Sequence, residues 1–138
     1  MATAEIKEKF LNDVVTAGLR SVVGLIFIVH GISKFNPGFT SFLTNNGIPV
    51  EMQIPLALAE LVPGILLIIG ILGRLSASLL SIVMLGAIFV IKGAKSLTGN
   101  GGVEIDLILL ASSIVIMILG PGRISLSHII KKIPRCLH

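Results

Sequence analysis

Four long apolar stretches constrain the fold of this chain more than any other feature. They cover residues 14–33, 54–72, 75–91 and 103–119 and contain few charged side chains. At 1.5 Å per residue, about 20 helical residues cross the ~30 Å hydrocarbon core of a bilayer, within a usual range of ~17–25. Charged residues make up 13% of the 138, against ~25% in ordinary soluble domains. A soluble core of this size cannot bury so much apolar surface. We therefore expect an all-α, integral membrane four-helix bundle that forms a single transmembrane domain over residues 1–138.

Glycine and proline mark the ends of the expected helices. Asn36-Pro37-Gly38 follows the first helix, Gly73-Arg74 separates the second from the third, and Gly120-Pro121-Gly122 stops the fourth. Between the first two spans, residues 39–44 predict a short amphipathic helix at the membrane interface. Its apolar side chains are then expected to face lipid: Phe39, Phe42 and Leu43.

The distribution of basic residues predicts the orientation. With four spans, both termini lie on one side together with eight of the eleven Lys and Arg, and the other side has Lys34, Lys92 and Lys95. The positive-inside rule then predicts a multi-pass protein of the cell membrane with both termini in the cytoplasm. The bilayer is thus one partner. The sequence has no Trp or Tyr and no basic stripe interleaved with aromatics, so we expect no nucleic-acid partner.

Four basic residues are expected to face lipid. Arg20 is expected to reach the lipid phosphates, with a pairing to Asp13 as the alternative. The tail over residues 124–138 is basic and mildly amphipathic, and its cations are expected to meet anionic lipid: Lys131, Lys132 and Arg135. The one cysteine, Cys136, cannot form an internal disulfide or a redox pair.

Several short motifs resemble the DoxX-like and DoxD-like membrane proteins. The first is Arg20-x3-Gly24-x5-His30-Gly31-x2-Lys34, and the second is Glu60-x2-Pro63-Gly64 with Gly70 and Gly73-Arg74 after it. Gly101-Gly102-x-Glu104 precedes the last span, and Gly120-Pro121-Gly122-Arg123-x-Ser125-Leu126 follows it. The family often has Asp after this Ser-Leu pair, where this chain has Ser127. The resemblance implies a four-helix bundle and an association with membrane redox chemistry, as in subunits of thiosulfate:quinone oxidoreductase.

Ionisable residues gather at the outer end of the expected bundle. Because charge inside a membrane is costly, each needs a partner or a polar pocket. One interpretation is a ligand or proton pocket, in which Lys34 and Lys92 attract an anion or a quinone carbonyl. The alternative is an ion-paired plug of Glu60 with Lys34 and of Glu104 or Asp106 with Lys92. The candidates are His30, Lys34, Glu60, Lys92, Glu104 and Asp106. Their spacing matches no metal-binding motif, so we predict no metal.

Two glycines and a Pro-Gly pair are candidates for helix packing. Gly24 and Gly31 are seven residues apart, so they share a helix face and are expected to let another helix approach closely. Pro63, followed by Gly64, frees a backbone carbonyl one turn earlier and predicts a kink.

The favoured function is an accessory or quinone-contacting subunit of a membrane oxidoreductase complex. The sequence has no cysteine pair and no nucleotide motif, so we do not expect the chain to be catalytic alone. No covalently bound cofactor is expected; a quinone is the candidate ligand, and other membrane subunits are the expected partners. The alternatives are a structural packing subunit of a larger membrane enzyme, or a small carrier or channel subunit.

Overall fold

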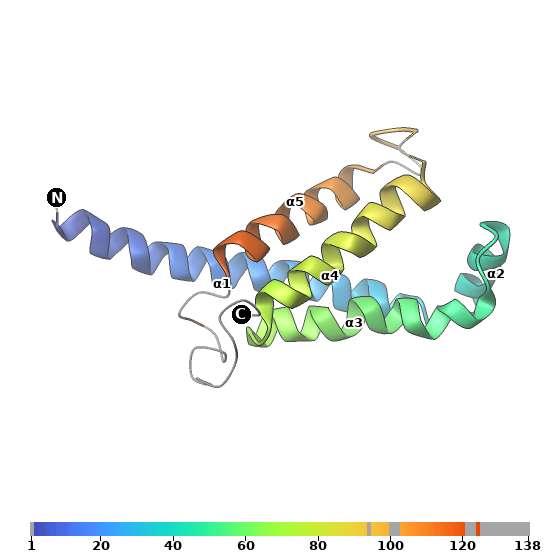
Figure 1. Ribbon diagram of the computed structural model, residues 1–138, viewed down its shortest axis with the longest axis horizontal. Helices are drawn as coiled ribbons and strands as arrows, with labels where there is room; N and C mark the ends of the chain where they lie inside the picture. Colours follow the sequence, from blue (N-terminus) through green and yellow to red (C-terminus); the bar gives the residue numbers. More distant parts are fainter. Residues whose placement is uncertain (1, 94, 100–102, 121–123, 125–138) are drawn as a thin grey trace.

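The computed structural model describes residues 2–93, 95–99, 103–120 and 124, with side chains from residue 10 onward. Within these residues the chain is helical and contains no strand. Its elements are α1 (Ala2–Ser33), α2 (Pro37–Asn45), η1 (Val50–Met52), α3 (Gln53–Ile69), α4 (Gly73–Gly86), η2 (Ala87–Ile91) and α5 (Glu104–Leu119). The long helices lie side by side, and α2 lies across one end (Figure 1).

The helix boundaries differ from the predicted ones in two informative places. The first helix begins at Ala2 rather than at residue 14, because good helix formers precede the apolar stretch. Helix α3 ends at Ile69 rather than at residue 72, because Gly70 adopts a left-handed conformation with φ of 81° and its N–H caps the carbonyl of Leu66. The last helix begins one residue later than predicted.

Among the described residues, three helical segments are long and apolar enough to cross a membrane: Phe10–Ser33, Val50–Ile69 and Gly73–Ile91. With 16 residues, α5 is shorter than these and about 24 Å long. The prediction of an all-helical chain is therefore confirmed for the described residues, and three of its segments have the length and apolar composition of membrane spans. The fourth crossing and the orientation stay predictions.

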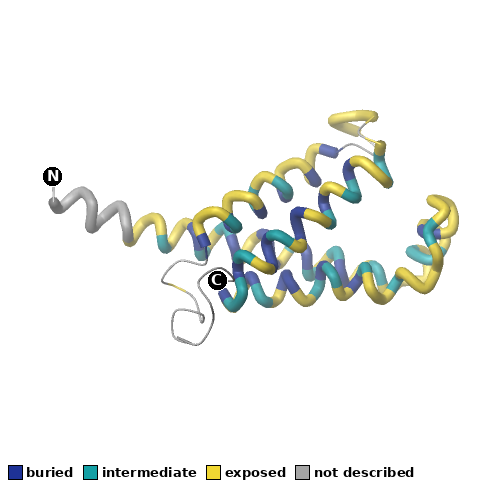
Figure 2. Tube along the Cα trace, in the orientation of Figure 1, coloured by how far each residue is buried: buried dark blue, intermediate teal, exposed yellow. Residues whose placement is uncertain are grey.

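The core lies where all four long helices meet. Helix α3 packs against α1 and α4, and α5 packs against α4 and α1. The helices contribute apolar side chains to one cluster: Val23 and Phe27, Leu67, Ala77, Leu80 and Met84, and Leu109 and Ile116. The outer faces of the helices are exposed (Figure 2), and many of the exposed residues are large and apolar. Exposed apolar surface on this scale is suited to a lipid environment.

Helices α1 and α3 approach each other closely at glycines. A Cβ atom added at Gly24 would lie 2.6 Å from the carbonyl oxygen of Gly64, and one at Gly31 would lie 3.0 Å from that of Ala57. Pro63 is buried within α3 next to this crossing. The glycines thus permit the close helix approach that their spacing indicated, whereas the kink at Pro63 stays a prediction.

Helix α2 is present as predicted, but its lipid-facing side was assigned incorrectly in part. Leu43 is fully buried and Phe39 is partly buried, whereas Phe42 is exposed. The Ile48 N–H donates to the carbonyl of Leu43. The chain after α2 therefore folds back, which turns one face of this helix inward.

Candidate functional site

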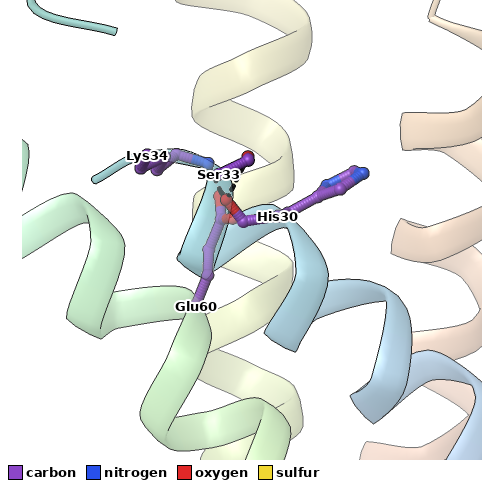
Figure 3. A network of polar contacts seen from close by, with 4 residues as sticks. All are labelled: His30, Ser33, Lys34 and Glu60. Carbon is purple, nitrogen blue, oxygen red and sulfur yellow. Dashed lines mark hydrogen bonds and ion pairs between the residues drawn. The ribbon is translucent and has the colours of Figure 1, made fainter. Parts of the chain in front are cut away.

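An ion pair joins the end of α1 to the middle of α3. Lys34 directly follows α1, and its ammonium lies 2.7 Å from the Oε2 atom of Glu60 (Figure 3). The Glu60 side chain is 4% exposed and that of Lys34 is 18% exposed. A carboxylate removed from water needs a partner of opposite charge. Lys34 supplies this partner across a sequence separation of 26 residues.

Two further elements converge on Lys34. The side-chain amide of Gln53, the first residue of α3, donates to the Lys34 carbonyl at 2.8 Å. The Lys34 ammonium lies 5.5 Å from the centroid of the Phe39 ring, within the range of a cation–π contact. Phe39 in turn stacks on Phe42, with centroids 5.6 Å apart and an interplanar angle of 19°. The site therefore combines a buried carboxylate, a partly exposed ammonium and an aromatic surface.

Sequence analysis made no prediction for Gln53, and it assigned Phe39 to the lipid-facing side of the short helix. The signal for Gln53 was its spacing, since Gln53 and Glu60 are seven residues apart and lie on one face of α3. Phe39 could not have been assigned to Lys34 from the pattern. Its position depends on how the chain turns between α1 and α2.

A second ion pair joins α4 to α5. The Lys92 ammonium lies 2.6 Å from the Oδ2 atom of Asp106, whose side chain is 10% exposed. Lys92 follows the π-helical turn η2, and its N–H donates to the carbonyl of Ala87. Asp106 lies in the first turn of α5, where a carboxylate also suits the helix dipole. Of the two predicted acids, Asp106 rather than the exposed Glu104 pairs with Lys92.

His30 does not take part in the Lys34–Glu60 pair. Its ring points away from the two side chains (Figure 3), and its contribution to the local network is a backbone carbonyl that accepts the Ser33 hydroxyl at 2.7 Å. The six candidate residues thus resolve into two ion pairs, with His30 and Glu104 outside them. Among the described residues, no group of three His, Cys, Asp or Glu side chains is close enough to hold a metal ion.

Arg20 corrects one prediction. The residue is 2% exposed rather than lipid-facing, and its Nη2 atom donates to the carbonyl of Ile124 at 2.7 Å. A guanidinium presents five donors in a planar fork, so Arg20 can donate to a backbone carbonyl of another segment. The other predicted lipid-facing cations lie outside the described residues: Lys131, Lys132 and Arg135.

Comparison of the sequence with known proteins places the chain in a family. A sequence model of the DoxX family matches residues 15–93, which include Lys34, Glu60 and Lys92. A protein of Bacillus subtilis (strain 168) named "Putative oxidoreductase CatD" is 33% identical over 122 residues, which span 87% of this chain and 90% of that protein. No solved structure matches the chain significantly.

Proposed function

This chain belongs to the DoxX family, and we propose that it is a membrane subunit of an oxidoreductase complex that contacts a quinone at the Lys34–Glu60 pair. The observation that supports the proposal most directly is the buried Glu60 carboxylate, held 2.7 Å from an ammonium that is itself partly exposed. Intramembrane ionisable residues of this kind are rare and often functional. The relative named as an oxidoreductase supports the class of reaction.

The chemistry of Lys34 fits a quinone carbonyl. An ammonium has three N–H donors, so it can donate to a ligand oxygen while it stays bound to Glu60. The stacked rings of Phe39 and Phe42 offer an apolar, aromatic surface next to this donor. Glu60 would act as the positioning residue, because its negative charge holds the ammonium at the end of α1.

A partner subunit would carry the redox cofactor. The sequence has one cysteine and no nucleotide-binding motif, so its own residues supply no cysteine cluster for iron and sulfur and no cradle for a flavin nucleotide. The role proposed for this chain is to bind and orient the quinone in the membrane, next to the subunit that transfers the electrons.

The test uses a variant designed to keep its fold. Lys34→Met combined with Glu60→Leu removes both charges at similar volume, which is often neutral for stability. We expect the full-length double variant, purified with its complex in mild detergent, to retain the partner subunits. Its bound quinone is expected to fall at least about tenfold, which corresponds to ~1.4 kcal/mol of binding free energy. Extraction and chromatography of the quinone measure this. Lys95→Met, which removes an exposed cation, is the matched control.

A structural packing role is the second candidate, and a specific observation favours it. Both ion pairs tie neighbouring helices together, α1 to α3 and α4 to α5. If the double variant assembles normally and its complex keeps both quinone content and quinone-dependent activity, the packing role replaces the quinone-contacting role. If no redox subunit co-purifies with the unchanged chain, membership of an oxidoreductase complex is wrong as well.

We also propose that α5 crosses the membrane and that both termini are cytoplasmic. Its 16 residues fall slightly short of the usual ~17–25, a mismatch that local thinning of the bilayer accommodates at modest cost. Eight of eleven Lys and Arg on the terminal side support the orientation.

Thiol labelling tests this topology with reporters at the two ends of α5. In intact cells, a membrane-impermeant maleimide is expected to label Lys95→Cys, made in a Cys136→Ser background. The native Cys136 is expected to react only after the membrane is permeabilised. Labelling of both positions from the same side would mean that α5 does not cross.

A further inference from the structure

One face of α1 is apolar and exposed along the whole span. Its residues recur at alternating intervals of four and three, which is the spacing of the a and d positions of a heptad repeat. At six of its seven positions the residue is between 56% and 66% exposed, and the seventh position is an exposed glycine. We call this face the α1 seam, and it consists of Leu11, Val15, Gly18, Val22, Leu25, Val29 and Ile32.

We propose that the α1 seam binds the α1 seam of a second copy of this chain, as a parallel helix pair within the membrane. This proposal does not depend on the proposed function. The two copies enter the membrane in the same orientation, so their α1 helices run parallel around a two-fold axis. The seam extends over 21 residue steps, about 30 Å, which matches the hydrocarbon thickness.

The residue types along the seam fit a two-stranded parallel pair. The a positions are all valine, at residues 15, 22 and 29, and two of the d positions are leucine, at residues 11 and 25. A β-branched residue at a with leucine at d favours parallel dimers. Gly18 occupies a d position, and a Cβ atom added there would meet nothing within 4 Å in its own chain. A small residue at this point allows two helices to approach closely in a membrane.

The charges of α1 are arranged so that two identical copies do not repel. In a parallel two-fold pair each seam residue faces its own counterpart, so a charge on or beside the seam would meet a like charge. Between residues 11 and 32, no ionisable residue occupies the seam or the e and g positions that flank it. Asp13 and Arg20 lie at the f position, opposite the seam, and buried Phe27 occupies the next f position. The opposite face thus packs within the chain, whereas the seam is exposed among the described residues.

At its N-terminal end the seam extends past the other helices that the structure describes. Gly24 contacts Gly64 and Ile68, and α3 ends one residue later at Ile69. Because α1 and α3 run antiparallel, α1 residues well before Gly24 extend beyond the end of α3, as Figure 1 shows. Leu11 and Val15 are in this extension and are 57% and 66% exposed. In the proposed pair, the α1 helix of the second copy covers Leu11 and Val15 together with the rest of the seam.

Disulfide cross-linking in native membranes tests the proposal. Single cysteines are placed along residues 15–29 of the full chain in a Cys136→Ser background, and the covalent dimer is measured after mild oxidation. We expect maxima at Val15, Gly18, Val22, Leu25 and Val29. The matched controls are cysteines at Leu79 and Ile82 of α4, which are 42% and 66% exposed and lie on another helix. Equal cross-linking at the α4 positions, or a profile without the seam's periodicity, overturns the proposal.

A second variant separates dimer formation from folding. Gly18→Leu adds a side chain into space that is open within one chain, so the protomer is expected to keep its helicity and yield. Cross-linking at Val22→Cys is then expected to fall at least about fivefold, because the added side chain separates the two helices. Gly86→Leu, also in open space, is the control and is expected to leave cross-linking unchanged. Unchanged cross-linking in Gly18→Leu, or cross-links to another protein in place of a second copy, would contradict the paired seam.

Discussion

Glu60→Gln is expected to lower the free energy of unfolding by about 2–3 kcal/mol. The substitution removes the charge that holds Lys34 and keeps the side chain's shape, so its cost comes from leaving an ammonium without its carboxylate. Breaking a buried pair by removing one partner costs about 3–5 kcal/mol, and the partial exposure of Lys34 places this pair below that range. Because the chain has no Trp or Tyr, thermal or denaturant unfolding in detergent is best followed by circular dichroism.

The double variant Lys34→Met with Glu60→Leu is expected to recover most of this loss. Well-packed apolar residues in place of a buried ion pair are often neutral or stabilising. Glu104→Gln serves as the control, because Glu104 is exposed and its loss is expected to cost less than about 0.5 kcal/mol. A Glu60→Gln variant as stable as the unchanged chain would show that Lys34 finds another partner or turns toward water at no cost.

The fold was predictable where one physical requirement acted alone. Apolar length and the Gly and Pro breaks indicated the long helices, because a bilayer tolerates few charged side chains in a crossing helix. The start of α1 was not predictable from hydropathy, since hydropathy does not report the intrinsic helix propensity of residues 2–9. The end of α3 depended on one glycine, because Gly70 rather than Gly73 adopts the left-handed conformation.

The ion pairs were predictable as pairs but not as a single site. Lys34 with Glu60 followed from depth and charge, and so did Lys92 with one of two nearby acids. Which acid pairs with Lys92 depends on the phase of the π-helical turn before it, and no sequence pattern gives that phase. The His30 ring points away from Glu60 (Figure 3). This direction likewise depends on how α1 is rotated about its own axis relative to α3.

Arg20 shows that the surroundings of a charged side chain cannot be predicted only from its position in an apolar stretch. Snorkelling to lipid is the common solution for a basic residue near a helix end. Here the residue faces the bundle instead, because a backbone carbonyl after α5 accepts its guanidinium. The sequence places these two residues 104 positions apart, so only the packing of α5 against α1 brings them together.

Gly24→Ala is expected to destabilise the protein by about 2–3 kcal/mol, although alanine is the better helix former. The added Cβ atom would lie 2.6 Å from the Gly64 carbonyl oxygen and 2.7 Å from the Cγ1 atom of Ile68. The isoleucine side chain can rotate, but the backbone carbonyl cannot move without shifting α3. Overpacking of this kind costs about 1–3 kcal/mol, and this value is near the upper end because the obstacle is backbone. Denaturant unfolding followed by circular dichroism measures the change.

Gly86→Ala is the matched control for this prediction. Gly86 ends α4, and a Cβ atom added there meets nothing within 4 Å, so the variant is expected to be as stable as the unchanged chain or to gain up to about 1 kcal/mol. The contrast separates crowding at the α1–α3 crossing from any general effect of removing a glycine. The shift of α3 in Gly24→Ala would also displace Glu60 from Lys34, so bound quinone is expected to fall together with stability. A Gly24→Ala variant that matches Gly86→Ala in stability would mean that α1 and α3 do not approach each other this closely.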